Sequence, residues 1–175
     1  SHVGGAELNV ASGVSLLGLH TGIISKLPAN AIGELARSKV RSMNVSDDYL
    51  VWDHTEDARL GAYFYESATF PRKPQVVYDR KHSSITRISI DEFPEEMYTS
   101  TRCFHVSGIT LALCPEARTC AVEMIKRFKQ AGAMISFDVN FRLNLWTGAE
   151  AKECIEGILP YVDIFFCSED TARLT

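Results

Sequence analysis

Residues 103–138 read CFHVSGITLALCPEARTCAVEMIKRFKQAGAMISFD, and their pattern decides the fold class of the chain. Two short apolar runs, residues 103–106 and 133–137, enclose a helical segment with Pro115 at its start and Gly132 just past its end. The apolar face of this helix consists of Ala117, Ala121, Met124, Ile125 and Phe128. A strand, a helix and a second strand in this order predict a βαβ unit, in which the strands lie parallel.

The same alternation continues on both sides of this unit. A third apolar run, residues 162–166, follows the second, and a weaker helix is expected between them at residues 148–157. Nearer the start, helices are expected at residues 7–17 and 31–41, with a strand at residues 22–25 between them. This alternation predicts an α/β fold, a parallel sheet with helices packed on it through right-handed crossovers.

Residues 49–90 break the alternation. They carry four short segments rich in β-branched and aromatic residues: YLVWDH, RLGAYFYES, QVVYDR and SITRISI. We expect these to form an antiparallel meander inserted in the α/β frame, which covers the main body or pairs with another subunit. The expected organisation is a first part of the core at residues 1–42, a β lid at residues 43–92, and the rest of the core at residues 93–175.

Composition excludes several classes of protein. Of the 175 residues, 46% are apolar and 23% charged, and the formal net charge of −4 argues against a nucleic-acid or anionic-membrane partner. No apolar run approaches the roughly 18 residues of a membrane span, and the opening residues show no signal-peptide pattern. The five cysteines lack CxxC spacing and the five histidines lack HxxxH or HExxH, so we expect a cytoplasmic protein with reduced thiols and no metal site.

Polar residues follow each of the three apolar runs. The first run is followed by SGIT at residues 107–110, the second by DVNFR at residues 138–142 and the third by SED at residues 168–170. Because ligands of open parallel sheets bind beyond the carboxyl ends of the strands, these residues together predict a binding edge. The alternative for any one of them is an ordinary loop residue or helix cap, and Ser168 has the right type for a helix cap.

Two arginines are candidates for binding an acidic group. The guanidinium of Arg142 has the geometry to hold a carboxylate or phosphate by two N–H groups, although a salt bridge to Asp138 is an equal alternative. Arg80 is two residues from Tyr78, so in a strand the two side chains share a face and form a clamp for a polar acid. The alternative is a common exposed cation–aromatic pair. Tyr63 is the third candidate in this β region.

The two glycines Gly4 and Gly5 precede the first expected helix. Glycines at this place allow a ligand to approach the backbone, and the N–H groups of the helix start favour oxygen-rich or anionic groups. A simple turn before a helix is an equal alternative. The segment matches neither GxGxxG nor a Walker loop, so it predicts neither a dinucleotide site nor a P-loop.

Together these segments resemble the PfkB, or ribokinase-like, carbohydrate kinase family, and within it the 2-keto-3-deoxygluconate kinases. The resemblance runs the length of the chain and implies a ribokinase-like three-layer α/β fold, with a parallel sheet, helices on both faces and a small inserted β lid. It also implies phosphorylation of the terminal hydroxyl of a sugar acid with ATP and Mg²⁺. The segments that carry it are GGAELNVASGVSLLG (residues 4–18), VVYDRKHSS (76–84), FHVSGITLAL (104–113), DVNFRLNLW (138–146) and YVDIFFCSEDTARLT (161–175).

Carried over by position, the resemblance implies roles for individual residues. The implied substrate-binding residues are Gly5, Ala6, Asn9, Tyr63, Tyr78, Arg80, Ile109 and Arg142. The implied nucleotide-binding residues are Asn140, Arg142 and Ser168, and Arg142 would also support phosphoryl transfer. The family's catalytic base is the Asp of a Gly-x-Gly-Asp motif, which has no counterpart among these residues.

The chain departs from the family pattern at several places. Pro28 stands where the N-terminal signature closes with Gly, and Ser168 to Thr171 stand where Asn-x-x-Glu is usual. The first strand and the oxyanion-binding glycines of the family also have no counterpart. We therefore expect the chain to be roughly half of a kinase, an excerpt that cannot by itself catalyse efficient transfer.

Other functions remain open from the sequence. A fructokinase- or ribokinase-like enzyme for neutral sugars is one alternative, and a non-catalytic sugar-binding or regulatory protein that keeps half the fold is another. A Rossmann oxidoreductase ranks last, because no Gly-rich fingerprint follows a strand. A homo-oligomer formed through the β lid is expected, because the open edges of a lid often pair.

Overall fold

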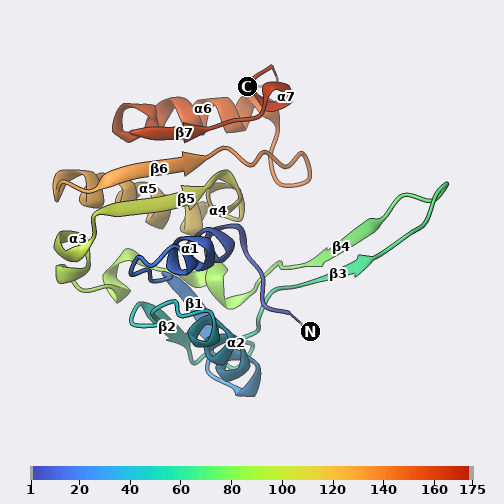
Figure 1. Ribbon diagram of the computed structural model, residues 1–175, viewed down its shortest axis with the longest axis horizontal. Coiled ribbons are helices and arrows are strands. Elements are labelled where there is room, and N and C mark those ends of the chain that lie inside the picture. Colours follow the sequence, from blue (N-terminus) through green and yellow to red (C-terminus); the bar gives the residue numbers. More distant parts are fainter. Residues whose placement is uncertain (1, 174–175) are drawn as a thin grey trace. The chain divides into compact units, whose positions relative to one another are not determined.

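The structure, a computed structural model, describes residues 2–173, which form helices and strands (Figure 1). The helices and strands are, in chain order, α1 (Ala6–Leu16), β1 (Ser25–Pro28), α2 (Ala31–Ser42), β2 (Leu50–Asp53), β3 (Ala62–Glu66), β4 (Gln75–Asp79), α3 (Glu96–Ser100), β5 (Cys103–Ser107), α4 (Gly108–Ala112), α5 (Pro115–Gln130), β6 (Met134–Asp138), α6 (Gly148–Ile158), β7 (Ile164–Phe166) and α7 (Glu169–Ala172). Leu174 and Thr175, the last residues of the segment YVDIFFCSEDTARLT, lie outside the described residues.

The chain forms two compact units. The first is built mainly of residues 12–87 and contains strands β1 to β4. The second joins residues 4–11 to the chain from residue 88 onward and contains β5, β6 and β7. Each unit has parallel strands of its own. The alternation of apolar runs and helices predicts those of the second unit.

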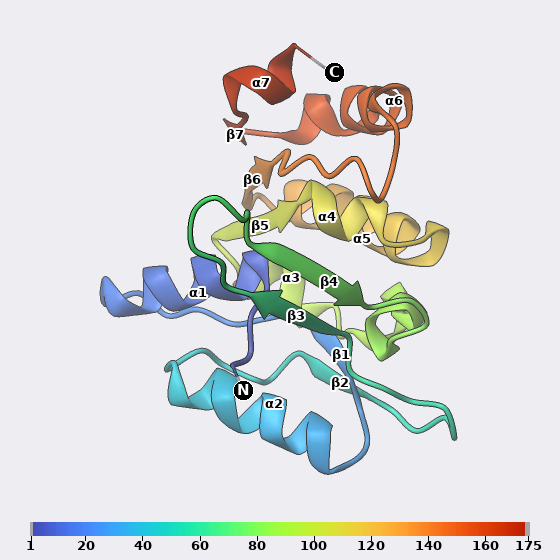
Figure 2. The ribbon, with the colours of Figure 1, turned by 90° about the vertical axis from the view of Figure 1, so that its right-hand side faces the viewer.

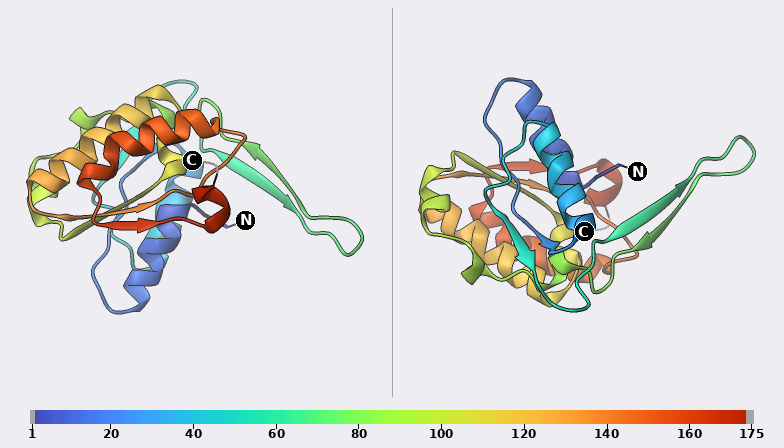
Figure 3. Two further views of the ribbon diagram at one scale, coloured as in Figure 1. Left: turned by 90° about the horizontal axis from the view of Figure 1, so that it is seen from above. Right: turned by 90° about the horizontal axis from the view of Figure 1, so that it is seen from below.

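The second unit is built on a parallel sheet with the strand order β5-β6-β7. Phe104 and Val106 of β5 share a face of this sheet with their partners Ile135 and Phe137 of β6, because alternate side chains of a strand point the same way. Helix α5 packs on this face, and its Phe128 stacks on Phe104 with the ring centroids 4.4 Å apart. Figure 3 shows α5 and α6 side by side on the same side of the sheet.

The two longer helices of this unit are those expected from the sequence. Pro115 is the first residue of α5, and Gly132 follows its end with a φ of +89°. Helix α6 begins with a capping box, in which Thr147 and Glu150 satisfy each other's backbone N–H groups. Both helices lie where the sequence predicts them, so these two predictions are confirmed. Residues close in sequence fix their ends.

The first unit contains the parallel pair of β1 and β2, in which Ser25 lies opposite Leu50. Helix α2 lies beside this pair (Figure 2). Gly33 of α2 comes so close to the strand that an added Cβ would lie 1.9 Å from the Pro28 carbonyl oxygen. The helix expected at residues 31–41 is confirmed.

Two strand predictions in the first unit are wrong. The strand expected at residues 22–25 is instead Ser25–Pro28, because Gly22 forms only an isolated bridge to Ser46 while the ladder with β2 begins at Ser25. The antiparallel meander expected at residues 49–90 is also wrong at both of its ends. Its first segment is β2, which pairs parallel with β1, and its last forms a 3-10 turn at Ser84–Arg87.

A local competition for hydrogen bonds explains the missing last strand. Ser83 and Ser84 are buried, and the Ser83 carbonyl accepts a hydrogen bond from the Thr86 hydroxyl at 2.7 Å. Hydroxyl side chains that bond to nearby backbone groups favour turns over strand ladders. Only the hairpin of β3 and β4 remains antiparallel, and the boundaries of the lid at residues 43–92 stay a prediction.

A buried carboxylate, Asp53, holds the end of β2 to the turn that follows the hairpin. Asp53 accepts hydrogen bonds from the Thr55 hydroxyl at 2.7 Å and from Arg87 Nη1 at 3.1 Å. Burial raises the pKa of Asp53, but the hydrogen bonds, led by the one from Thr55, outweigh burial and bring that pKa to about 2. Asp53 is therefore charged at neutral pH, and Arg87 balances its charge.

Candidate functional site

The carboxyl end of β5 is a tightly packed part of the candidate site. Ser107 ends the strand with no exposed surface, and α4 begins at the next residue. Gly108 lies so close to the chain after β6 that an added Cβ would be 2.1 Å from the Val139 carbonyl oxygen. Glycine is therefore required where these two strand ends meet.

Glu7, in the first turn of α1, binds the same strand end. Its carboxylate oxygen Oε1 accepts hydrogen bonds from the Ser107 amide at 3.0 Å, from the Ser107 hydroxyl at 2.7 Å and from the Thr110 hydroxyl at 2.7 Å. Sequence reasoning missed this residue. The only local feature that could have indicated it is an acid in the first turn of a helix that follows two glycines. Acids at this position often only stabilise the helix dipole, so the feature is not specific.

Four of the expected substrate-binding residues lie close to Glu7 in the sequence or beside its hydrogen-bond partners. Gly5 has a φ of +145°, a conformation that favours glycine, and its carbonyl accepts the Asn9 amide at 3.0 Å. Asn9 is exposed, whereas Ala6 is half-buried. Ile109 lies between Ser107 and Thr110 at the start of α4, so the contacts of Glu7 bring the Gly5 to Asn9 turn to the helix that carries Ile109.

The segment after β6 carries the acid, amide and guanidinium seen in the sequence. Asn140 has a φ of +36°, and its amide donates to Asp138 Oδ1 at 3.1 Å, which turns the chain sharply. Arg142 is exposed, and its Nη1 donates to the Phe141 carbonyl at 3.1 Å. The salt bridge to Asp138 considered as an alternative for Arg142 is not among the ion pairs of residues 2–173.

Trp146 follows this segment and anchors it in the core of the second unit. It is almost fully buried, and the guanidinium of Arg118 lies 5.6 Å from its ring centroid. Arg118 Nε also donates to the Leu111 carbonyl of α4 at 2.8 Å. Arg118 therefore links α4 to the chain after β6, and the cation–π contact with Trp146 stabilises its guanidinium.

His105, a half-buried histidine of β5, lies two residues before Ser107. His105 Nδ1 is 2.9 Å from the Ser136 hydroxyl, and Nε2 is buried without a hydrogen-bond partner in the described part of the chain. Burial lowers the pKa of His105, although the nearby carboxylates of Glu7 and Asp138 raise it. The imidazole is therefore neutral at pH 7 and adds no charge to the site.

Ser168, expected to bind nucleotide, caps the helix α7. Its hydroxyl accepts the Thr171 amide at 3.3 Å and lies 2.8 Å from the Thr171 hydroxyl. The cap considered as an alternative for this residue is thus confirmed. Next to it, Glu169 pairs with Arg173, so this carboxylate is engaged with its own helix.

The hairpin of the first unit carries the other three expected residues. Tyr63 and Tyr78 are cross-strand partners with ring centroids 6.1 Å apart, and the Arg80 guanidinium lies 4.4 Å from the Tyr78 ring centroid. The expectation that Tyr78 and Arg80 share a face is confirmed. Arg59 donates hydrogen bonds to the carbonyls of Asp79, the last residue of β4, and of Lys81, and these bonds hold the end of β4 in place.

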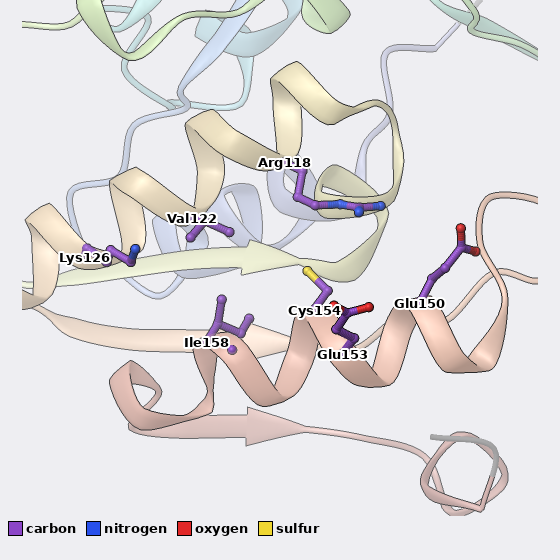
Figure 4. A pocket seen from close by; sticks show the side chains of 8 residues that line it. Arg118, Val122, Lys126, Glu150, Glu153, Cys154 and Ile158 are labelled. Atoms are coloured by element: carbon purple, nitrogen blue, oxygen red, sulfur yellow. The ribbon is translucent and has the colours of Figure 1, made fainter.

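A surface hollow between α5 and α6 lies in the second unit (Figure 4). It has a volume of about 440 Å³ and contains none of the residues expected at the site. Its lining mixes basic and acidic side chains over an apolar floor. The lining residues are Arg118, Val122, Lys126, Glu150, Glu153, Cys154, Gly157 and Ile158.

Residues 2–173 contain neither a cluster of metal-binding side chains nor a helix that could cross a membrane. Within this range no group of three or more His, Cys, Asp or Glu side chains is arranged to hold a metal ion. The helices of the same range are all too short or too polar to cross a membrane.

Comparison with known proteins places the chain in a family. The family model described as pfkB family carbohydrate kinase matches residues 1–175. The chain belongs to the PfkB family of carbohydrate kinases. The resemblance to this family stated from the sequence is therefore confirmed.

Named PfkB relatives cover almost all of this chain. The 2-dehydro-3-deoxygalactonokinase of Haloferax volcanii is 35% identical over 169 residues, which are 97% of this chain and 52% of the relative. The crystal structure of 2-dehydro-3-deoxygluconokinase from Thermotoga maritima has a TM-score of 0.91 and 34% identity, covering 98% of this chain and 52% of that one. An uncharacterized sugar kinase from Pyrococcus horikoshii in complex with ATP has a TM-score of 0.82 and 28% identity, with coverage of 94% and 53%.

These comparisons confirm the ribokinase-like α/β fold class, with parallel sheets, helices and a small antiparallel sheet. The chain spans about half the length of the PfkB relatives it matches. This share agrees with the expectation that it corresponds to part of a kinase.

Proposed function

We propose that the protein containing this chain is an ATP-dependent sugar kinase that phosphorylates the terminal hydroxyl of a sugar acid, most specifically 2-keto-3-deoxygluconate. The observation that carries the choice of an acid is the Arg80 guanidinium stacked on Tyr78, opposite Tyr63 on one face of the hairpin. A guanidinium beside tyrosine rings is a group suited to bind a carboxylate through charge-assisted hydrogen bonds. The names of the Haloferax and Thermotoga relatives support the same substrate class.

In this proposal, residues of the second unit bind the sugar hydroxyls and the phosphates. The Gly5 backbone and the exposed Asn9 amide would bind sugar hydroxyls, with Ala6 and Ile109 beside them. Arg142 is exposed at the strand end, where its N–H groups would reach the sugar's acid end or the transferring phosphate. For the nucleotide, the proposed residues are Asn140, Arg142 and Ser168.

The reaction requires little covalent chemistry from these residues. The bond between the terminal phosphorus of ATP and the ADP oxygen breaks as the sugar hydroxyl oxygen bonds to phosphorus, and the hydroxyl proton passes to a base. That base, the Asp of a Gly-x-Gly-Asp motif, has no counterpart in this sequence. The residues described here therefore position the sugar and neutralise charge, which are the larger part of catalysis in phosphoryl transfer.

ATP and Mg²⁺ belong to the proposal. The Pyrococcus kinase in complex with ATP supports a nucleotide, since its fold matches this chain. Mg²⁺ would supply charge neutralisation for the phosphates when bound. The residues near α7 do not fit a dedicated metal site, because Ser168 caps the helix and Glu169 pairs with Arg173, so the proposal gives Mg²⁺ no ligand in residues 2–173. A cytoplasmic location is also proposed, and five cysteines without a disulfide support it.

The function is tested by assaying the natural full-length protein with ATP and a panel of sugars. We expect a kcat/KM for 2-keto-3-deoxygluconate or its galactonate epimer about 100-fold above that for fructose or ribose, as a clamp built for a carboxylate predicts. Higher efficiency with a neutral sugar would favour a fructokinase-like enzyme instead. Sugar binding without phosphorylation would favour a non-catalytic sugar-binding protein.

Arg80→Ala tests the acid clamp directly. We expect it to raise KM for the sugar acid by about tenfold or more and to leave neutral sugars within about twofold, because a charge-assisted hydrogen bond to the carboxylate is lost. Arg72→Ala is the matched control. Arg72 is an exposed arginine in the loop between β3 and β4, and it pairs with Glu66. Equal changes for acid and neutral sugars would contradict the role of Arg80.

We also propose that the hairpin pairs with a second copy of the chain. Phe64 and Val77 are cross-strand partners on the face opposite Tyr63 and Tyr78, and they are 66% and 61% exposed. A two-stranded sheet with apolar groups exposed on both faces is marginal by itself. One face would hold the sugar, and the other would pack against the partner copy.

Replacing both Phe64 and Val77 by serine tests this pairing. We expect sedimentation at micromolar concentration to change from a dimer to a monomer, since the apolar area that drives association is removed. Phe70→Ser is the control, because Phe70 is 94% exposed but lies outside the strand ladder. A wild-type protein that sediments as a monomer would refute the pairing.

A further inference from the structure

Glu7 lies between two residues to which the proposed function gives sugar contacts, Gly5 and Asn9. Its side chain points away from that role, because Oε1 is occupied by three donors from the end of β5 and the start of α4. Two of these donors belong to Ser107 and one to Thr110. The first turn of α1 is thus joined to α4 by one carboxylate oxygen.

The contact joins segments far apart in the sequence. Ser107 and Glu7 are 100 residues apart, and all contacts between them lie within the second unit. Ser107 has no exposed surface, and its own side chain makes no capping hydrogen bond to α4. Without Glu7 the Ser107 amide would be a buried donor with no acceptor, which is costly.

We infer that Glu7 is a positioning residue for the sugar. By binding Ser107 and Thr110, which flank Ile109, it holds the Gly5 to Asn9 turn in register with the helix that carries Ile109. This inference rests on the proposed function, because it assigns Glu7 no contact with the sugar and acts through residues to which that function gives such contacts.

Glu7→Ala in the natural full-length protein tests the inference. We expect KM for the sugar acid to rise by about tenfold, because the two halves of the sugar site lose their common register. KM for ATP should stay within about twofold. Glu7→Gln keeps the length of the side chain and one acceptor oxygen, and it should recover most of the lost affinity.

Glu150→Ala is a matched control. The Glu150 carboxylate also accepts a backbone amide and a hydroxyl, both from Thr147, but it caps α6 away from the residues with proposed sugar contacts. Both alanine variants lose a helix-capping carboxylate. We expect only Glu7→Ala to change the KM of the sugar, while both lower the unfolding midpoint.

Thr110→Val provides a milder version in case Glu7→Ala does not fold. It removes one of the three donors at nearly constant volume, so we expect a rise in sugar KM of about threefold with ATP unaffected. The inference is overturned if these variants leave the sugar KM at the wild-type value, if they change the KM of ATP equally, or if Glu7→Gln is as impaired as Glu7→Ala.

The same assay separates the two failures. If the wild-type protein phosphorylates no sugar, the proposed function fails, and the role of Glu7 falls with it. If the wild-type protein is active and Glu7→Ala behaves like Glu150→Ala, the inference about Glu7 alone fails.

Discussion

Gly108→Ala is expected to lower the free energy of unfolding by about 3 kcal/mol or more, enough to unfold much of a marginally stable protein. An alanine Cβ would lie 2.1 Å from the Val139 carbonyl oxygen and 3.4 Å from Cζ2 of Trp146. The first of these is a backbone atom at the end of a strand, which cannot turn aside as a side chain does. Urea titration of the natural full-length protein measures the change.

Gly157→Ala is the matched control for this substitution. Gly157 lies in α6, and nothing is within 4 Å of the position of an added Cβ. Alanine favours helix over glycine by about 0.5–1 kcal/mol, so this variant should be slightly more stable than wild type. The same chemical change is thus expected to act in opposite directions, and similar effects at the two positions would contradict the close approach at Gly108.

Phe128→Ala should destabilise the protein by about 3–5 kcal/mol. Phe128 is 1% exposed and stacks on Phe104, and it meets Tyr98 edge to face with ring centroids 4.8 Å apart. Alanine would leave a cavity between α5 and β5. The cavity could close only if α3, α5 and β5 moved together. Thermal unfolding followed by circular dichroism should show a clearly lower Tm.

Phe70→Ala distinguishes burial from the loss of an aromatic ring in general. Phe70 is 94% exposed, so its removal should change the free energy of unfolding by less than about 0.5 kcal/mol. If Phe128→Ala were as mild as Phe70→Ala, the contact between α5 and the sheet would not be a main source of stability.

The sequence was sufficient where structure depends on near neighbours. Helix α5 begins at Pro115 and is followed by Gly132, and α6 begins with the Thr147 and Glu150 box, so local residues name their ends. The shared face of Tyr78 and Arg80 also follows from the two-residue period of a strand. The cap formed by Ser168 is local in the same sense.

The sequence alone was enough to predict the family and the βαβ alternation. It also predicted which polar segments follow the strands β5, β6 and β7. The tertiary structure decided which distant groups meet: β2 pairs with β1 and not with the hairpin, and Glu7 binds Thr110, 103 residues away. The reason is physical. A strand or a carboxylate shows in its own sequence that it needs hydrogen-bond partners, but the choice of partner is set by the packing of the whole unit.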